Sequence, residues 1–265
     1  MHRSIRATLI AGATLAGLLL GAAAQAHSPY MLPSAFDVSD RKVVTVQGAF
    51  TEAFFSPEVA MKSDAYAVIG PDGKRTPLTP TYLRELALVE VPTEAAGTYR
   101  VTTGQRIGRT AKAALIKGEW VFLENPAAAP AGAQVVDMTS MTVADVYVTK
   151  GKPNAAAVAP VGKGLEFVAI THPSSIFTGE DAVFEVLFDS KPVAGQEITL
   201  HAGDDRYADV KTPPKALKSD AKGRFAIKVE RSGVYQIQAR YRVAPTADGL
   251  AGQSHTYALT FESLR

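Results

Sequence analysis

The sequence predicts an all-β protein made of two β-sandwich domains. Short runs of β-branched and aromatic residues recur along the chain, and turn signals such as Pro71-Asp72-Gly73 separate them. The 16 prolines and 21 glycines are typical of a chain with many short strands. A helical period is nearly absent, and residues 81–88 are the one segment that fits a helical turn. Together these observations favour β-sandwiches.

The first 26 residues have the pattern of a secretory signal peptide. Arg3 and Arg6 precede an uncharged, apolar stretch over residues 7–24, and the segment ends in Ala24-Gln25-Ala26. A membrane anchor is the alternative, but the stretch is close to the short limit for crossing a bilayer. We therefore expect cleavage after Ala26, export to the periplasm, a soluble mature protein and His27 as its N-terminus.

The N-terminal domain is predicted over residues 27–150. The segment 111–123 indicates a hairpin, because a glycine turn separates two apolar runs. The Pro/Ala-rich segment 125–133 is expected to be a loop, and residues 151–164 are expected to link the two domains. Strands are expected at residues 43–50, 65–69, 86–91, 97–102, 111–116, 119–123 and 135–149.

The C-terminal domain is predicted over residues 165–265. In the run 196–202, Ile198 and Leu200 share one face, which we expect to be the core, while His201 points outward into solvent. By the same alternation, His255 lies on the apolar face of the last strand. Strands are expected at residues 165–171, 181–188, 196–202, 224–229, 234–243 and 255–262.

Composition excludes several classes of function. Of 28 basic residues, Arg3 and Arg6 leave with the signal peptide, so 26 basic residues balance 26 acidic ones and the net charge falls from +2 to zero. A neutral chain is a poor nucleic-acid binder. The absence of cysteine excludes disulfides, thiolate metal sites and cysteine nucleophiles.

Motifs for the common enzyme classes are also absent. The sequence has no G-x-S-x-G elbow, no H-E-x-x-H, no phosphate-binding loop and no G-x-G-x-x-G. We therefore expect a protein that is not an enzyme. A copper oxidoreductase with an amino-terminal histidine brace is the exception that stays open, and it would need a second histidine opposite His27.

The expected N-terminus is the best candidate for a metal site. A free α-amine and an imidazole on the same residue can chelate one ion, and such nitrogen donors suit nickel, copper and zinc. His172, in a loop after a strand, and His255 are the candidate additional ligands. Asp37, Glu52 and Glu58 are acidic groups near the start of the mature chain. A solvated or structural role is the alternative for each histidine.

A set of loose motifs resembles one known family. These are F-D-S-K-P-V-A-G-Q-E-I-T-L at 188–200, S-D-A-K-G-R-F at 219–225 and S-G-V-Y at 232–235, together with His27 and Tyr30 after the signal. The three C-terminal motifs resemble an immunoglobulin-like or prealbumin-like sandwich. In this order, the whole set is similar to the domain-of-unknown-function family 4198, described as a periplasmic component of nickel/cobalt uptake systems. Ser28 stands where family members often carry an acidic residue.

Two functions follow as expectations. The resemblance implies a periplasmic accessory protein that captures a divalent ion (nickel, cobalt or copper) and delivers it to a membrane metal transporter or an outer-membrane receptor. The alternative is an interaction module that binds a receptor, a partner protein or a glycan. In that case exposed aromatic residues such as Trp120 or Tyr82 would matter, and a metal would not.

Overall fold

The computed structural model describes residues 27–204, 214–246 and 251–265. Within them the regular secondary structure is almost entirely β-strand, which confirms the all-β sandwich fold predicted from the sequence. The predicted signal peptide, residues 1–26, lies outside the described residues. None of the helices in this part of the chain is long and apolar enough to cross a membrane.

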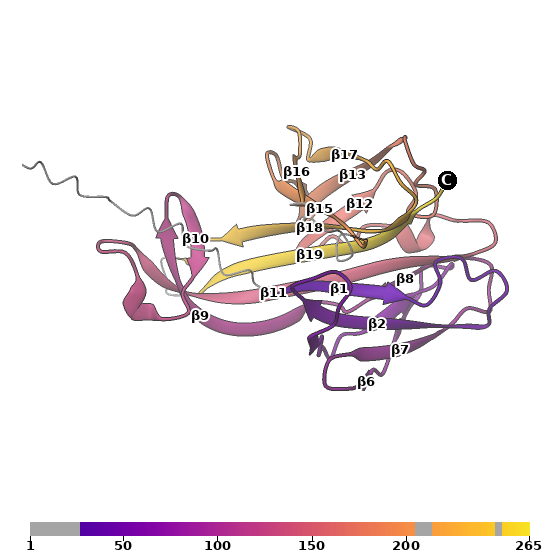
Figure 1. Cartoon of the computed structure of the whole chain (residues 1–265), viewed down its shortest axis with the longest axis horizontal. Coiled ribbons are helices and arrows are strands. Elements are labelled where there is room, and N and C mark those ends of the chain that lie inside the picture. Colours follow the sequence, from indigo (N-terminus) through magenta and orange to yellow (C-terminus); the bar gives the residue numbers. More distant parts are fainter. Residues whose placement is uncertain (1–26, 205–213, 247–250) are drawn as a thin grey trace, which may run out of the picture.

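A ten-stranded sheet forms the middle layer (Figure 1). Its strands follow the order β16-β15-β18-β19-β11-β8-β4-β5, while β9 pairs with β11 and β10 with β9. The strands are β4 (Ala67–Ile69), β5 (Arg75–Pro77), β8 (Gly97–Thr102), β9 (Arg106–Ile116), β10 (Glu119–Phe122), β11 (Val135–Lys150), β15 (Glu197–Ala202), β16 (Lys215–Lys218), β18 (Gly233–Val243) and β19 (Gly252–Ser263).

Two smaller sheets cover the middle layer. The five-stranded sheet contains β1 (Ser28–Pro33), β2 (Val43–Thr51), β3 (Val59–Ala60), β6 (Thr81–Tyr82) and β7 (Ala87–Pro92). The four-stranded sheet contains β12 (Leu165–Ala169), β13 (Asp181–Phe188), β14 (Lys191–Pro192) and β17 (Arg224–Lys228). Two single-turn 3-10 helices in the described residues are η1 (Pro126–Ala128) and η2 (Ala156–Val158).

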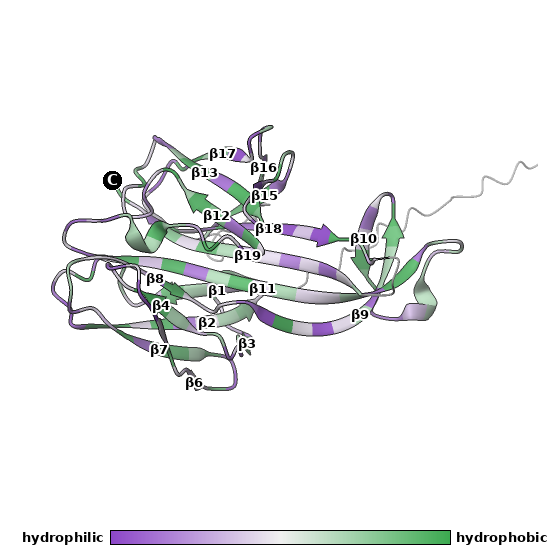
Figure 2. Ribbon diagram, turned by 180° about the vertical axis from the view of Figure 1, so that it is seen from behind, coloured by the Kyte–Doolittle hydropathy of each residue, from purple (hydrophilic) through white to green (hydrophobic). Residues whose placement is uncertain are grey.

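The central strands β11 and β19 contribute to two cores at once. Val146, Val148 and Ala258 belong to the core under the five-stranded sheet, whereas Tyr147 and Leu259 belong to the core under the four-stranded sheet. Successive side chains of a strand point to opposite faces, so a strand between two layers is apolar on both. In Figure 2, hydrophobic residues, coloured green, recur along β11.

A parallel pairing of β11 with β19 joins the two predicted halves. Their register runs from Met138 opposite Gly252 to Val146 opposite Thr260. The two strands come from the predicted N-terminal and C-terminal domains, so both halves contribute to one sheet. The segment 151–164 packs against this framework, because Val158 is part of the core under the four-stranded sheet.

The hairpin expected over residues 111–123 is present as β9 and β10. Ile116 pairs with Glu119, which leaves Lys117 and Gly118 as a two-residue turn. Both turn residues have positive φ, 51° and 86°. The two-residue turn whose twist matches that of the flanking strands requires such angles. The hairpin and the first part of β11 project beyond the two smaller sheets (Figure 1).

Several local features differ from the sequence expectation. Residues 81–88, which fitted a helical turn, form β6, a turn over residues 83–86 and the start of β7, because β6 pairs with Leu88 and Ala87. Strand β1 was not predicted, since its sequence S-P-Y-M-L-P has two prolines and no alternation. Strand β16 was also not predicted; it forms by pairing with β15.

Candidate metal centre

His27 is placed by the pairing of the first two strands. Ser28 is paired with Thr51 in antiparallel register, so His27 comes opposite Glu52, where both strands end. The side-chain amide of Gln236 on β18 donates to the carbonyl oxygen of Pro29 at 2.8 Å and fixes β1 on the middle sheet. The start of the described chain is therefore held on a rigid scaffold.

The loop from Glu52 to Glu58 folds back over the end of β2. Phe50 pairs with Val59, so Glu58 returns beside the residue where the loop began. Thr51 is fully buried, and its hydroxyl donates to the carbonyl oxygen of Ser56 at 2.5 Å. This bond holds the two ends of the loop together, and the loop brings both glutamates to His27.

Aromatic packing holds the same loop against the sheet. Phe54 lies edge-on to Tyr30 of β1, with ring centroids 6.5 Å apart, and it also contacts the ring of His201 at 4.6 Å. His201 lies on the opposite face from Ile198 and Leu200, as predicted, but it is half-buried under the loop, so the prediction that it is solvated is wrong. A Cβ at Gly203 would lie 2.8 Å from Phe55, so glycine is needed for the loop to approach β15 this closely.

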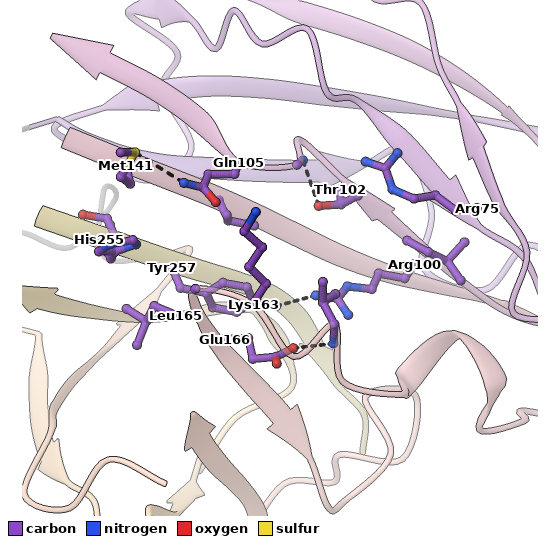
Figure 3. Close-up of a pocket in the computed structure, with 16 residues that line it drawn as sticks. Arg75, Arg100, Thr102, Gln105, Met141, Lys163, Leu165, Glu166, His255 and Tyr257 are labelled. Atoms are coloured by element: carbon purple, nitrogen blue, oxygen red, sulfur yellow. Dashed lines mark hydrogen bonds between the residues drawn. The ribbon is translucent and has the colours of Figure 1, made fainter. Parts of the chain in front are cut away.

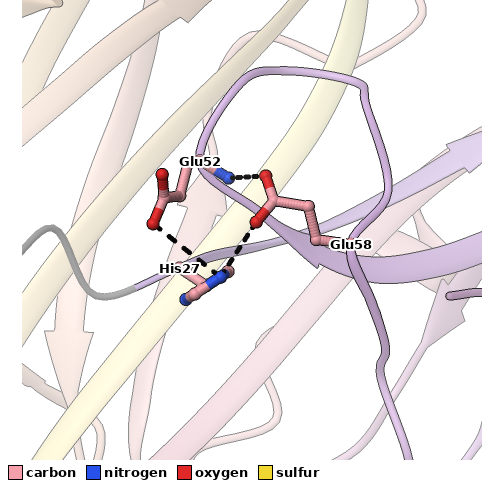
Figure 4. A group of neighbouring side chains, drawn as sticks. All are labelled: His27, Glu52 and Glu58. Atoms are coloured by element: carbon pink, nitrogen blue, oxygen red, sulfur yellow. Dashed lines mark hydrogen bonds and ion pairs between the residues drawn. The ribbon is translucent and has the colours of Figure 1, made fainter.

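The three side chains converge as a cluster (Figure 4). His27 Nε2 lies 2.9 Å from Glu58 Oε2 and 3.9 Å from Glu52 Oε1. The other oxygen of Glu58, Oε1, accepts a hydrogen bond from the Glu52 backbone N–H at 2.8 Å. All three side chains are accessible, with exposed fractions of 43%, 57% and 37% for His27, Glu52 and Glu58.

This donor set fits a divalent transition metal. One ligand atom from each residue lies within 4.8 Å of the others, as atoms around a shared ion do. Bonds from such an ion to imidazole nitrogen or carboxylate oxygen measure about 2.0–2.2 Å. Imidazole suits nickel, copper and zinc, and the carboxylates add charge that attracts a cation. Among the described residues no other group of three such side chains comes this close.

His172 occupies a hydrogen-bonded position and is not part of this cluster. Its Nδ1 accepts from the Ser174 backbone N–H at 3.1 Å, which makes Nε2 the protonated nitrogen that donates to the carbonyl oxygen of Asn154 at 3.1 Å. Thr98 Oγ1 also lies 3.2 Å from Nε2. Nε2 therefore holds the segment 151–164 through Asn154, Nδ1 is used by Ser174, and His172 is not grouped with His27 as a histidine brace would require.

His255 also lies apart from the cluster. It is 6% exposed on β19, on the same face as Tyr257 and Leu259, as the alternation of the strand predicts. Its Nε2 lies 2.9 Å from Gln253 Oε1, and its ring packs nearly perpendicular to that of Phe188, with ring centroids 4.9 Å apart. Of the three histidines expected as ligands, only His27 has carboxylates within ion-binding distance in the described residues.

Glu52 and Glu58 are the additional candidate ligands that the structure supplies. In the sequence they were acidic groups near the start of the mature chain without a partner. Their signal was the spacing of T-E-A-F-F-S-P-E, where a short loop separates the two carboxylates at the end of a strand. Only the register of β1, β2 and β3 reveals that this loop folds onto His27.

Burial of His172 and His255 predicts a loss of stability in acid. Burial lowers the pKa of both histidines below the usual 6.5. The Asn154 carbonyl partly offsets this lowering for His172, and the Asp189 carboxylate partly offsets it for His255. The unfolded chain therefore binds more protons than the folded protein does in this pH range. The contribution of the two histidines to the free energy of unfolding is fully maintained above pH 6.5 and falls as the pH drops through the pKa values of the folded protein.

Urea unfolding of the metal-free protein at a series of pH values measures this effect. We expect the unfolding midpoint to fall between about pH 7 and pH 5. The double variant His172→Gln, His255→Gln is expected to show a shallower fall over this range. An unchanged slope in the variant would contradict this assignment.

Comparison with known proteins identifies a family but no function. No curated protein matches the chain. The family model described as "Domain of unknown function (DUF4198)" matches residues 24–243, which include the His27 cluster and most of the three sheets. The chain belongs to this family of unknown function.

Proposed function

We propose that this protein is a periplasmic accessory protein that captures a divalent transition metal, nickel or cobalt and also copper, for uptake through a membrane transporter. The observation that carries the proposal is the convergence of His27, Glu52 and Glu58 at one accessible position. The sequence adds a signal peptide that would end one residue before His27. The metal is cargo, so an accessible site suits capture and release better than a closed structural site does.

Signal cleavage would give His27 a second way to bind an ion, through Nδ1 instead of Nε2. After cleavage the backbone nitrogen of His27 is a free α-amine, and this amine and the ring Nδ1 can chelate one ion. Glu58, at 2.9 Å from Nε2, then fixes the orientation of the ring, as carboxylates do behind metal-bound histidines. Without cleavage, the ligands available are Nε2 and the two carboxylates. The proposal therefore expects the affinity for metal to depend on processing.

Calorimetric titration of Ni²⁺ into two forms of the protein tests the proposal. One form begins at His27, and the other carries one additional residue before it. We expect the processed form to bind at least about tenfold more tightly, which corresponds to about 1.4 kcal/mol. Equal affinity would exclude a role for the amine, and the absence of Ni²⁺, Co²⁺ and Cu²⁺ binding by both forms would overturn the function.

A further inference from the structure

A cavity of about 300 Å³ lies on the opposite face of the middle sheet from β1. Its walls come from β8, β11 and β19 and from the segment 161–166, which leads into β12 (Figure 3). Strands β4 and β5 supply the outer rim through Ile69 and Arg75. The size is at the lower end of the range typical of small-molecule sites.

Part of the cavity lining is apolar. Val143 and Met141 of β11 and Leu165 of β12 line it, and Leu165 is only 4% exposed. Gln105 fixes the Met141 thioether, because its amide Nε2 donates to the sulfur at 3.4 Å. Such walls favour a hydrocarbon or aromatic group over a hydrated ion.

Two basic side chains stand at the rim of the cavity. Arg75 and Lys163 are both exposed, and neither has an ion-pair partner among the described residues. One η nitrogen of Arg75 donates to the Ala65 carbonyl oxygen at 2.9 Å, which steadies the guanidinium. In Figure 3 the Lys163 side chain extends toward Gln105, above Tyr257 and Leu165.

The carboxylates near the cavity are already occupied. Glu166, 2% exposed, accepts from the backbone N–H groups of Val161 and Gly162, both at 2.8 Å. Asp145 binds Arg100, which lines the cavity. Among the described residues, no carboxylate forms an ion pair with Arg75 or Lys163, so both cations remain available to an anionic ligand.

We propose that this cavity binds a small organic monocarboxylic acid, with its carboxylate at the basic rim of Arg75 and Lys163 and its apolar body against Val143, Met141 and Leu165. Arginine and lysine suit a carboxylate, and the apolar walls remove the rest of the molecule from water. A free metal ion is disfavoured by the same two positive charges. This site is separate from the His27 cluster and does not depend on metal binding.

Ligand-observed NMR with metal-free protein tests the proposal. The probes are benzoate, phenylacetate and 4-methylpentanoate, and benzamide is the uncharged analogue of benzoate. We expect at least one of the acids to bind with a dissociation constant below about 1 mM, and benzamide to bind about tenfold more weakly than benzoate. Failure of all three acids to bind, or equal binding of benzamide and benzoate, would overturn the proposal.

Variants locate the binding. The double variant Arg75→Gln, Lys163→Gln removes only exposed charges, and we expect it to weaken binding of the acid about tenfold or more. Lys222→Gln, an exposed lysine that does not line the cavity, is the matched control and is expected to bind like the parent protein. Binding that survives the double variant would place the acid elsewhere.

A third variant separates this proposal from the metal function. His27→Ala removes the metal cluster, and we expect its affinity for the acid to be unchanged. Loss of acid binding in this variant would show that the carboxylate binds at the His27 cluster, which would overturn the cavity assignment. Loss of metal binding alone leaves the cavity assignment intact.

Discussion

Replacing Asp145 with asparagine is expected to lower the free energy of unfolding by about 3–5 kcal/mol. Asp145 has no exposed surface, and its Oδ2 accepts from Arg100 Nε at 2.8 Å and from the Tyr257 hydroxyl at 2.5 Å. Arg100 is itself only 3% exposed. A neutral side chain at position 145 leaves the Arg100 guanidinium buried without a counter-charge, and that is the physical source of the cost.

Urea unfolding of metal-free protein measures this cost, and Asp137→Asn is the matched control. Asp137 pairs with Lys112 at 3.0 Å, but the two side chains are 53% and 45% exposed, so solvent screens the pair. Loss of the Asp137–Lys112 pair is expected to change the free energy of unfolding by at most about 1 kcal/mol. Similar losses of unfolding free energy at positions 145 and 137 would contradict the view that burial makes the Arg100–Asp145 pair more important for stability than an exposed pair.

A charge-free version of the same pair gives a further check. The double variant Arg100→Met, Asp145→Leu removes both charges together, so no ion remains unpaired. We expect it to be more stable than Asp145→Asn alone, because apolar replacement of a whole buried ion pair is often neutral or stabilising. A double variant as unstable as the single one would assign the cost to lost packing and not to the unpaired charge.

Replacing His27 with alanine in the processed protein is expected to weaken Ni²⁺ binding by more than about 100-fold, since residues that merely orient a ligand already contribute about 10- to 100-fold. The change removes the ring nitrogen that faces Glu52 and Glu58. It leaves the α-amine in place, so the experiment isolates the imidazole. Calorimetric titration measures the affinity.

The carboxylates are tested in the same assay. Glu52→Gln and Glu58→Gln are each expected to weaken binding about tenfold, and the double variant more strongly. Glu90→Gln, an exposed carboxylate on β7 outside the cluster, is the matched control. Unchanged Ni²⁺ affinity in the double variant would exclude the two carboxylates from the site.

Local features of the fold were predictable because local sequence fixes them. The alternation in residues 181–188 and the apolar face of residues 255–262 appear in the structure as β13 and β19. Lys117-Gly118 fixed the β9–β10 turn, since both residues must adopt positive φ. By contrast, β1 has neither alternation nor high strand propensity, and it is held by Gln236, a residue more than 200 positions away.

The candidate site could be predicted only in part. His27 was found from the position of the cleavage motif, which is a feature of the sequence alone. His172 was chosen because it follows a strand in a loop, but the backbone of Asn154 and Ser174 uses both of its ring nitrogens. Composition and spacing carry no information about such contacts, because they depend on which segments meet in space.

The sequence by itself determined the strand-rich fold class, the absence of thiol chemistry and the candidacy of His27, because propensity, composition and cleavage signals are local properties. The tertiary structure decided which carboxylates meet His27, since Glu58 reaches it only through the pairing of β3 with β2. It also decided that both halves share one sheet, through the parallel pairing of β11 with β19. Long-range register follows from the packing of two cores at once, and no single segment encodes it.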